Sequence, residues 1–261
     1  SNDVLAGLVT LANGTISGSG TLIAANGYSV TNGLISANLA GGILTKGGDG
    51  TVTLSGSNNT FGGMVTVAKG TIAFITGATN ATDAQSLGTN RDLFLGTNGS
   101  TGTVTLLYKG FGSAVLAKNI SGNSSGTNII QNGGSGTLTL TGTITDNAGK
   151  LIFIPGAGLV IGNMGGGDPV FDGGVTTLAG RGFYDAPTFL INRAVVDANV
   201  SGALPTNSPT DVYLDVSTND ARDGRGGSVL NINADQTVAS LAGHASSTVT
   251  LNNSSILSFS N

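Results

Sequence analysis

Aspartate side chains are the residues in this sequence that could hold a metal ion. All fourteen acidic residues are Asp, and there is no cysteine. Carboxylate oxygens are the hard ligands that calcium prefers. Two pairs of Asp residues lie beside glycines. Neither pair matches a helix-loop calcium motif or a nonapeptide calcium repeat, and Asp beside Gly also commonly forms turns. The candidate calcium ligands are Asp168, Asp172, Asp220 and Asp223. Calcium is the one cofactor that the sequence leaves open.

Residues for acid–base or nucleophilic chemistry are scarce. Enzymes that cleave polysaccharides need clustered carboxylates with a basic partner. His244 is the only histidine, and Gly243-His244-Ala245 has no adjacent Asp pair. One His without Cys also excludes a His-based metal site and a Cys–His nucleophile. We therefore predict that the chain is not an enzyme. A glycan-active enzyme that uses Asp220 or Asp223 is the third interpretation, behind two structural ones.

The composition indicates a folded β protein. Of 261 residues, 44 are glycine, 39% are hydrophobic and only 9% are charged. Disordered chains show the opposite balance, and strong helix formers are scarce here. A net charge of −4 disfavours nucleic-acid binding. No apolar run approaches the roughly 18 residues of a membrane span. The chain opens on Ser1, and we interpret it as a mature product or an excerpt.

Short strands recur along the chain. Gly-Thr followed by an apolar residue is repeated, and in four places it extends into strict alternation of Thr with Val or Leu. Period-2 alternation puts the apolar residues on one face, which predicts a strand with one buried side. The four alternating segments are 51–54, 103–106, 137–140 and 248–251.

Such short strands need neighbours stacked above and below, because each has too little apolar face to be stable alone. We therefore predict an all-β fold in which residues 1–261 form one parallel β-solenoid with lateral loops. A repeat of roughly 20 residues would give about a dozen coils. We expect helix only as short turns near 82–87 and 194–198.

Residues 42–74 carry the most regular repeat. The segments Gly42-Ile43-Leu44-Thr45-Lys46, Gly50 to Gly56, Asn59 to Gly63, Val65 to Val67 and Gly70-Thr71-Ile72 follow one another without a gap. This pattern resembles the autotransporter-associated β-strand repeat, with Phe61 and Met64 in place of a usual Tyr and Thr. The resemblance implies a right-handed parallel β-helix on a bacterial surface protein, and it implies no catalytic motif.

Residues 181–226 form a more polar segment. Ten of the 24 charges and three of the five prolines, Pro187, Pro205 and Pro209, fall within it. Prolines interrupt strand pairing and charges require solvent. We expect a loop-rich segment, a pair of coils whose long lateral loops leave the axis of the rod.

Both ends of the chain are apolar and strand-like, without a polar cap or a covering helix. Open solenoid ends invite pairing with another copy, and a head-to-tail contact that does not close produces a filament. The expected assembly residues are Val4, Leu5, Leu8, Val9, Leu11, Ile256, Leu257 and Phe259.

The sequence thus predicts a bacterial, extracellular or cell-surface structural protein that polymerises end to end. The alternative is a segment of an autotransporter adhesin passenger, whose further coils cover these ends. Surface glycans or host and matrix molecules are the other partners that such a protein could meet. Its exposed Asn, Ser and Thr suit carbohydrate contact, although there is no Trp.

Overall fold

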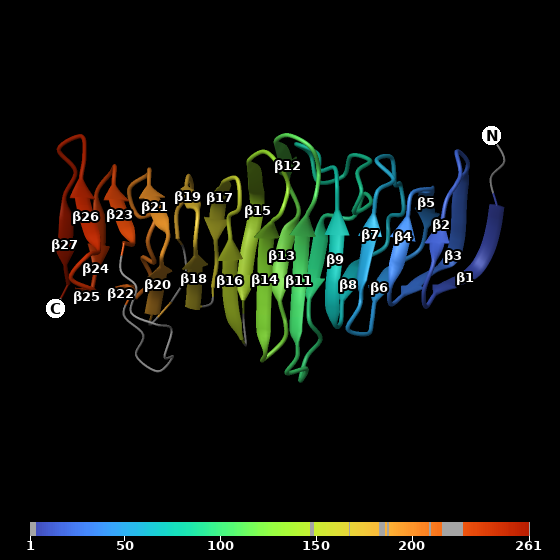
Figure 1. Cartoon of the computed structure of the whole chain (residues 1–261), viewed down its shortest axis with the longest axis horizontal. Helices are drawn as coiled ribbons and strands as arrows, with labels where there is room; N and C mark the ends of the chain where they lie inside the picture. Colours follow the sequence, from blue (N-terminus) through green and yellow to red (C-terminus); the bar gives the residue numbers. More distant parts are fainter. Residues whose placement is uncertain are drawn as a thin grey trace.

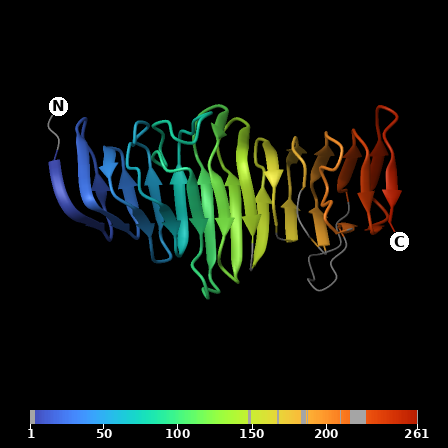
Figure 2. The ribbon, with the colours of Figure 1, turned by 180° about the vertical axis from the view of Figure 1, so that it is seen from behind.

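The structure, a computed structural model, describes residues 4–146, 149–166, 168–182, 186, 188–208, 210–215 and 227–260, with side chains from residue 6 onward. All regular structure in these residues is β-strand, in 27 short elements. They stack along one long axis into a rod, with the N- and C-termini at opposite ends (Figures 1 and 2). The expectation of an all-β parallel solenoid is confirmed.

One side of the rod is an 11-stranded parallel sheet to which each turn contributes one strand. The solenoid therefore has about 11 turns. Turn length varies: Ile35 pairs with Leu54 early in the rod, whereas Phe74 pairs with the more distant Tyr108. The strands of this sheet are β2 Thr15–Ile16, β4 Gly33–Ile35, β7 Thr51–Leu54, β9 Gly70–Phe74, β11 Thr103–Tyr108, β14 Thr127–Asn132, β16 Lys150–Ile154, β18 Asp168–Asp172, β20 Thr188–Asn192, β22 Asp211–Leu214 and β25 Ser240–Gly243.

A 14-stranded parallel sheet forms the remaining sides. The first half of β3 pairs with β5 and its second half with β6, and β1 and β15 each shift register midway. Such irregularities bend a strand, so this sheet turns a corner. The strands of this sheet are β1 Val4–Leu11, β3 Thr21–Val30, β5 Asn38–Gly41, β6 Leu44–Lys46, β8 Val65–Val67, β10 Asp92–Leu95, β12 Ala114–Leu116, β13 Asn119–Gly122, β15 Leu138–Asp146, β17 Leu159–Met164, β19 Val175–Leu178, β21 Val195–Ala198, β23 Val229–Ile232 and β26 Thr248–Leu251. A separate pair joins β24 Gln236–Val238 and β27 Leu257–Phe259.

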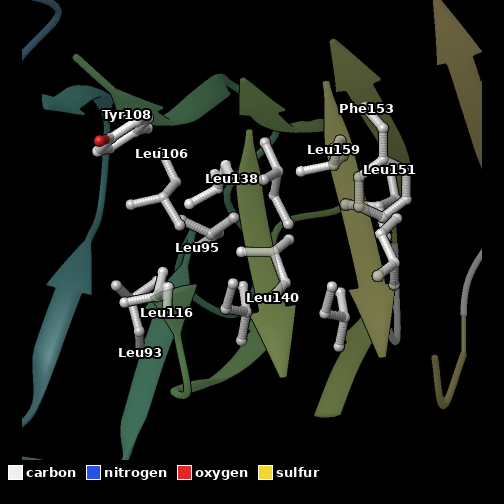
Figure 3. Close-up of a cluster of buried hydrophobic side chains, with 14 of the residues drawn as sticks. Leu93, Leu95, Leu106, Tyr108, Leu116, Leu138, Leu140, Leu151, Phe153 and Leu159 are labelled. Atoms are coloured by element: carbon white, nitrogen blue, oxygen red, sulfur yellow. The ribbon is translucent and has the colours of Figure 1, made fainter. Parts of the chain in front are cut away.

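Side chains alternate along the strands between pointing into the interior of the rod and pointing outward. In β21, Val196 and Ala198 are buried while Val195 and Asp197 are partly exposed. Figure 3 shows leucine and aromatic side chains from several turns, such as Leu106 and Leu138, pointing into one shared interior. The core therefore runs along the rod as columns of side chains stacked turn upon turn.

Aromatic rings form one of these columns. The rings of Phe153 and Phe171 stack with their centroids 5.2 Å apart, and Phe171 and Phe189 are 4.9 Å apart. All three side chains are fully buried. Rings at this separation attract one another beyond their simple burial.

A buried lysine lies at one corner of the rod. Lys46 is fully buried at the end of β6, and its Nζ donates hydrogen bonds to the carbonyls of Gly47, Gly48 and Lys69 at 2.6, 2.8 and 2.8 Å. The side chain thus fixes the backbone where two successive turns leave the sheet. Burial lowers the pKa of Lys46 to about 8, and the nearby Asp49 partly offsets this effect.

Two local expectations differ from the structure. Residues 195–198 form β21, which is paired on both sides by β19 and β23, and not a helical turn. Residues 82–87 form turns without helix. In the segment 181–226, β20, β21 and β22 lie within the sheets. Pro187, Pro209 and residues 216–226 lie outside the described residues.

The aromatic column yields a stability prediction. Replacing Phe171 with Ala removes a buried ring between two others, and we expect a loss of about 3–5 kcal/mol in the free energy of unfolding. Phe111 is fully exposed, so Phe111→Ala is the matched control and should change stability by less than about 0.5 kcal/mol. Urea unfolding followed by circular dichroism measures both. Equal effects of the two substitutions would contradict the packing described here.

The buried lysine yields a pH prediction. The folded chain releases the Lys46 proton near pH 8, whereas an unfolded lysine keeps its proton to pH 10.5. The folded state therefore binds fewer protons in this window, and stability should rise with pH there. We expect the urea midpoint of the native chain to increase from pH 7 to about pH 9.5, and to increase less in Lys46→Met. An equal pH response in both proteins would show that Lys46 does not titrate in this way.

Candidate functional site

The first strands of the rod present an unpaired edge. Within the described residues, β1 pairs only with β3 and β2 only with β4. Val9 and Leu11 lie in register with the buried Tyr28 and Val30 of the next turn. The outer backbone edge of β1 therefore has unused hydrogen-bonding groups next to apolar core residues.

The last strands present the opposite edge. Within the described residues, β25, β26 and β27 each have one partner. Phe259 lies in register with Val238, and Leu251 with Ile232. Val238 and Ile232 are fully buried, whereas Phe259 is 57% and Leu251 56% exposed. Side chains that continue the core columns are therefore open to solvent at this end.

The predicted assembly residues separate into two groups. Val9, Leu11, Leu257 and Phe259 lie in the core columns at the two ends. Leu8 lies in register with Gly27 and is 58% exposed, and Ile256 precedes β27 and is 60% exposed. These two are outside the core columns. The side chains of Val4 and Leu5 lie outside the described residues, although their backbone belongs to β1.

Sequence reasoning missed other members of the end surfaces. They are Ile16 in β2, Leu241 in β25, and Val249 and Leu251 in β26. Ile16, Leu241 and Val249 are only partly buried against the core. The alternation of 248–251 marked a strand, but only the strand order shows that this strand ends the stack.

None of the end strands β1, β2, β25, β26 and β27 contains a charged residue that would block pairing along its edge. The sequence has no Asp, Lys or Arg between Asp3 and Lys46, and none after Asp235. Natural β proteins usually protect exposed edge strands with lysine, proline or an inward charge. Both end surfaces thus have the apolar, uncharged character of strands that pair.

The candidate calcium ligands are not brought together. Asp168 and Asp172 lie at opposite ends of β18. Asp168 accepts a hydrogen bond from the Thr188 N–H at 3.2 Å, and Asp172 accepts one from Asn192 at 2.9 Å. No group of three His, Cys, Asp or Glu side chains suited to a metal occurs among the described residues. Asp220 and Asp223 lie outside these residues.

The single histidine lies in a surface turn. His244 is exposed, and its Nδ1 lies 2.9 Å from the Ser246 hydroxyl.

The described part of the chain contains no helix that is long and apolar enough to span a membrane.

Asp215 follows β22 and is hydrogen-bonded to residues of neighbouring turns. Its carboxylate accepts hydrogen bonds from the Arg193 N–H, from the N–H and hydroxyl of Ser228, and from the Ser247 hydroxyl, at 2.7 to 2.8 Å. Burial alone would raise the pKa of Asp215, but these hydrogen bonds outweigh it and lower the pKa. The carboxylate therefore joins three successive turns in its ionised form.

A polar groove lies on the side of the rod near its middle. Its volume is about 330 Å³, and it is formed by the loop between β9 and β10 together with the corners of the following turns. Threonine and asparagine side chains and Arg91 line it. It is the second candidate site after the end surfaces.

Comparison of the chain with models of protein families, with curated proteins and with solved structures gives no match.

Asp215 yields an acid-stability prediction. Because its pKa is lowered in the folded state, the carboxylate stabilises the fold above the pKa of an unfolded Asp, about 3.9, and this contribution is lost as the pH falls. We expect Asp215→Asn to cost about 1–3 kcal/mol at pH 7, and less near pH 3. Urea midpoints at the two pH values measure the difference.

Asp83→Asn is the matched control, because Asp83 is exposed and its carboxylate forms no hydrogen bond or ion pair with any described residue, so this substitution should change stability by less than about 0.5 kcal/mol. A loss for Asp215→Asn that is the same at both pH values would contradict a role for the ionised carboxylate.

Proposed function

We propose that the chain is a structural β-solenoid unit of an extracellular fibre, and that copies join end to end through their terminal strands. The observation that carries this proposal is the pair of unpaired, uncharged edges at β1 and β2 and at β25, β26 and β27. Each edge holds backbone groups and core side chains that would gain a partner in a stack. Opposite ends of a parallel stack are complementary and non-identical, so the contact is heterologous and propagates.

The contact that continues the core places β27 of one copy on the second half of β1 of the next. Leu257 would then lie beside Val9, and Phe259 beside Leu11, because these are the residues in the core columns. The outward-facing Thr10 and Ser258 would lie side by side. Apolar contact and main-chain hydrogen bonds are the forces that stabilise strand addition of this kind.

The alternative is a passenger segment of an autotransporter adhesin. In that case further coils of the same polypeptide, and not a second copy, would cover the end strands. The repeat in residues 42–74 supports this alternative, because its strands β6 to β9 occupy successive turns of the stack. That resemblance is also the basis for placing the protein at a bacterial surface. The intact mass of the natural product distinguishes the two: a product much longer than 261 residues favours the passenger.

The assembly test introduces a charged side chain into the core column that is exposed at the C-terminal end of the rod. Phe259→Lys puts a cation into the proposed junction, and the monomer should still fold because this side chain is 57% exposed. We expect filaments of the unaltered chain in negative-stain electron microscopy and only monomers of Phe259→Lys in sedimentation velocity. Circular dichroism checks that the variant remains folded.

Ile256→Lys is the matched control, since Ile256 is 60% exposed on the same turn but lies outside the core columns. It should assemble like the unaltered chain. Monodisperse monomers of the unaltered chain at high concentration, or filaments of Phe259→Lys, would overturn the proposal.

A further inference from the structure

The loop between β9 and β10 interrupts one side of the solenoid. Strand β12 pairs only with β15 within the described residues, and the loop occupies the space along its other edge. A Cβ atom on Gly77 would lie only 2.0 Å from the Val115 carbonyl oxygen, so the loop backbone lies directly against β12. The loop in the long turn between Phe74 and Tyr108 therefore packs against the body of the rod. It replaces a paired strand on that side.

Buried hydrogen bonds hold this loop in one conformation. The Ser86 hydroxyl accepts a hydrogen bond from the Thr76 N–H at 3.1 Å, and the Asn59 amide donates to the Ser86 carbonyl at 2.7 Å. Asn59 and Ser86 are fully buried. A loop fixed in this way can hold surface groups in place without paying an ordering cost on binding.

Lys118 joins the loop to the next turn. It is 1% exposed, and its Nζ donates to the carbonyls of Ala81 and Gly88 at 3.3 and 2.9 Å and to the Asn90 carbonyl. Burial lowers the pKa of Lys118 to about 8, so the side chain still carries its charge at pH 7. A positive charge therefore lies beneath the loop.

The groove described above lies at this interruption. Asn119 is one of its lining residues and is held in place, because its side chain accepts a hydrogen bond from the Thr143 N–H at 3.1 Å and donates one to Asp92 at 2.9 Å. The residues that present polar side chains along it are Thr79, Asn80, Arg91, Asn119, Thr141 and Thr143. Hydroxyls and amides thus dominate the lining, and no aromatic side chain belongs to it.

Arg91 is the only charged residue that lines the groove. The side chain is exposed, and its guanidinium forms no hydrogen bond or ion pair with any described residue. Asp92, the next residue in the sequence, accepts a hydrogen bond from Asn119, and neither Asp92 nor Asp83 lines the groove. A guanidinium with its donors free matches a carboxylate in two-point geometry.

We propose that this groove binds an acidic oligosaccharide, with a sugar carboxylate on Arg91 and sugar hydroxyls on the threonine and asparagine side chains. A cavity of about 330 Å³ is at the small end of the range for ligand pockets, which suits one or two sugar rings. The polar lining favours a ligand rich in hydroxyl groups over an apolar one. The site lies on the side of the rod, so it is independent of whether the ends join.

The test measures binding of a galacturonic acid disaccharide by isothermal titration calorimetry, with a neutral galactose disaccharide as the comparison. The unaltered chain should bind the acid at least about fivefold more tightly than the neutral sugar, and Arg91→Gln should weaken acid binding about tenfold, as expected for one charged hydrogen-bonding group. Arg91 is exposed, so the variant should fold.

Lys109→Gln is the matched control, because Lys109 is another exposed cation and lies outside the groove. This variant should keep the affinity of the unaltered chain within about twofold, since long-range charge alone is largely screened by salt. The proposal is overturned if the acid does not bind, if the neutral sugar binds equally well, or if Lys109→Gln loses as much affinity as Arg91→Gln.

Discussion

Parallel pairing between successive turns is the interaction on which the whole structure depends. Most strands have only three to six residues, and such a strand is stable only with a neighbour on each side. The pairing demands that inward and outward residues stay in register from turn to turn, and it places no demand on the loops between. This is why turns of unequal length, such as that between Phe74 and Tyr108, share one core. Within the described residues, the strands at the two ends of the stack pair on one side only.

Polar residues carry a second part of the architecture, at the places where the chain leaves the sheets. Lys46, Lys118 and Asn59 are buried, and each uses its polar end to bond backbone carbonyls or amides of adjacent turns. Buried charged groups are rare unless they are satisfied in this way. The lysine that holds the inserted loop also positions the groove beside it. Fold and candidate binding site therefore share the same buried contacts.

The alternation of Thr with Val or Leu was sufficient to predict the strands at 51–54, 103–106 and 248–251, because local period and tertiary pairing agree there. The expected helical turn at 194–198 was wrong, since pairing with β19 and β23 outweighs the weak local preference of an alanine-flanked segment. The groove could not be predicted, because it depends on where the loop interrupts a sheet. Nor could the burial of Lys118, since no local pattern distinguishes it from a surface lysine. Phe259 and Ile256 are both exposed apolar residues near the end of the chain. Only the strand register shows that Phe259 lies in a core column and Ile256 does not.

The most direct test of end-to-end assembly is a site-specific disulfide across the proposed junction. The chain has no cysteine, so Thr10→Cys and Ser258→Cys can be made as separate single variants and mixed under mild oxidation. Adjacent strands lie about 4.8 Å apart, within the Cα range of a disulfide. The account predicts a reducible dimer in the mixture and none in either variant alone. No cross-link in the mixture, or equal cross-linking of each variant with itself, would contradict it.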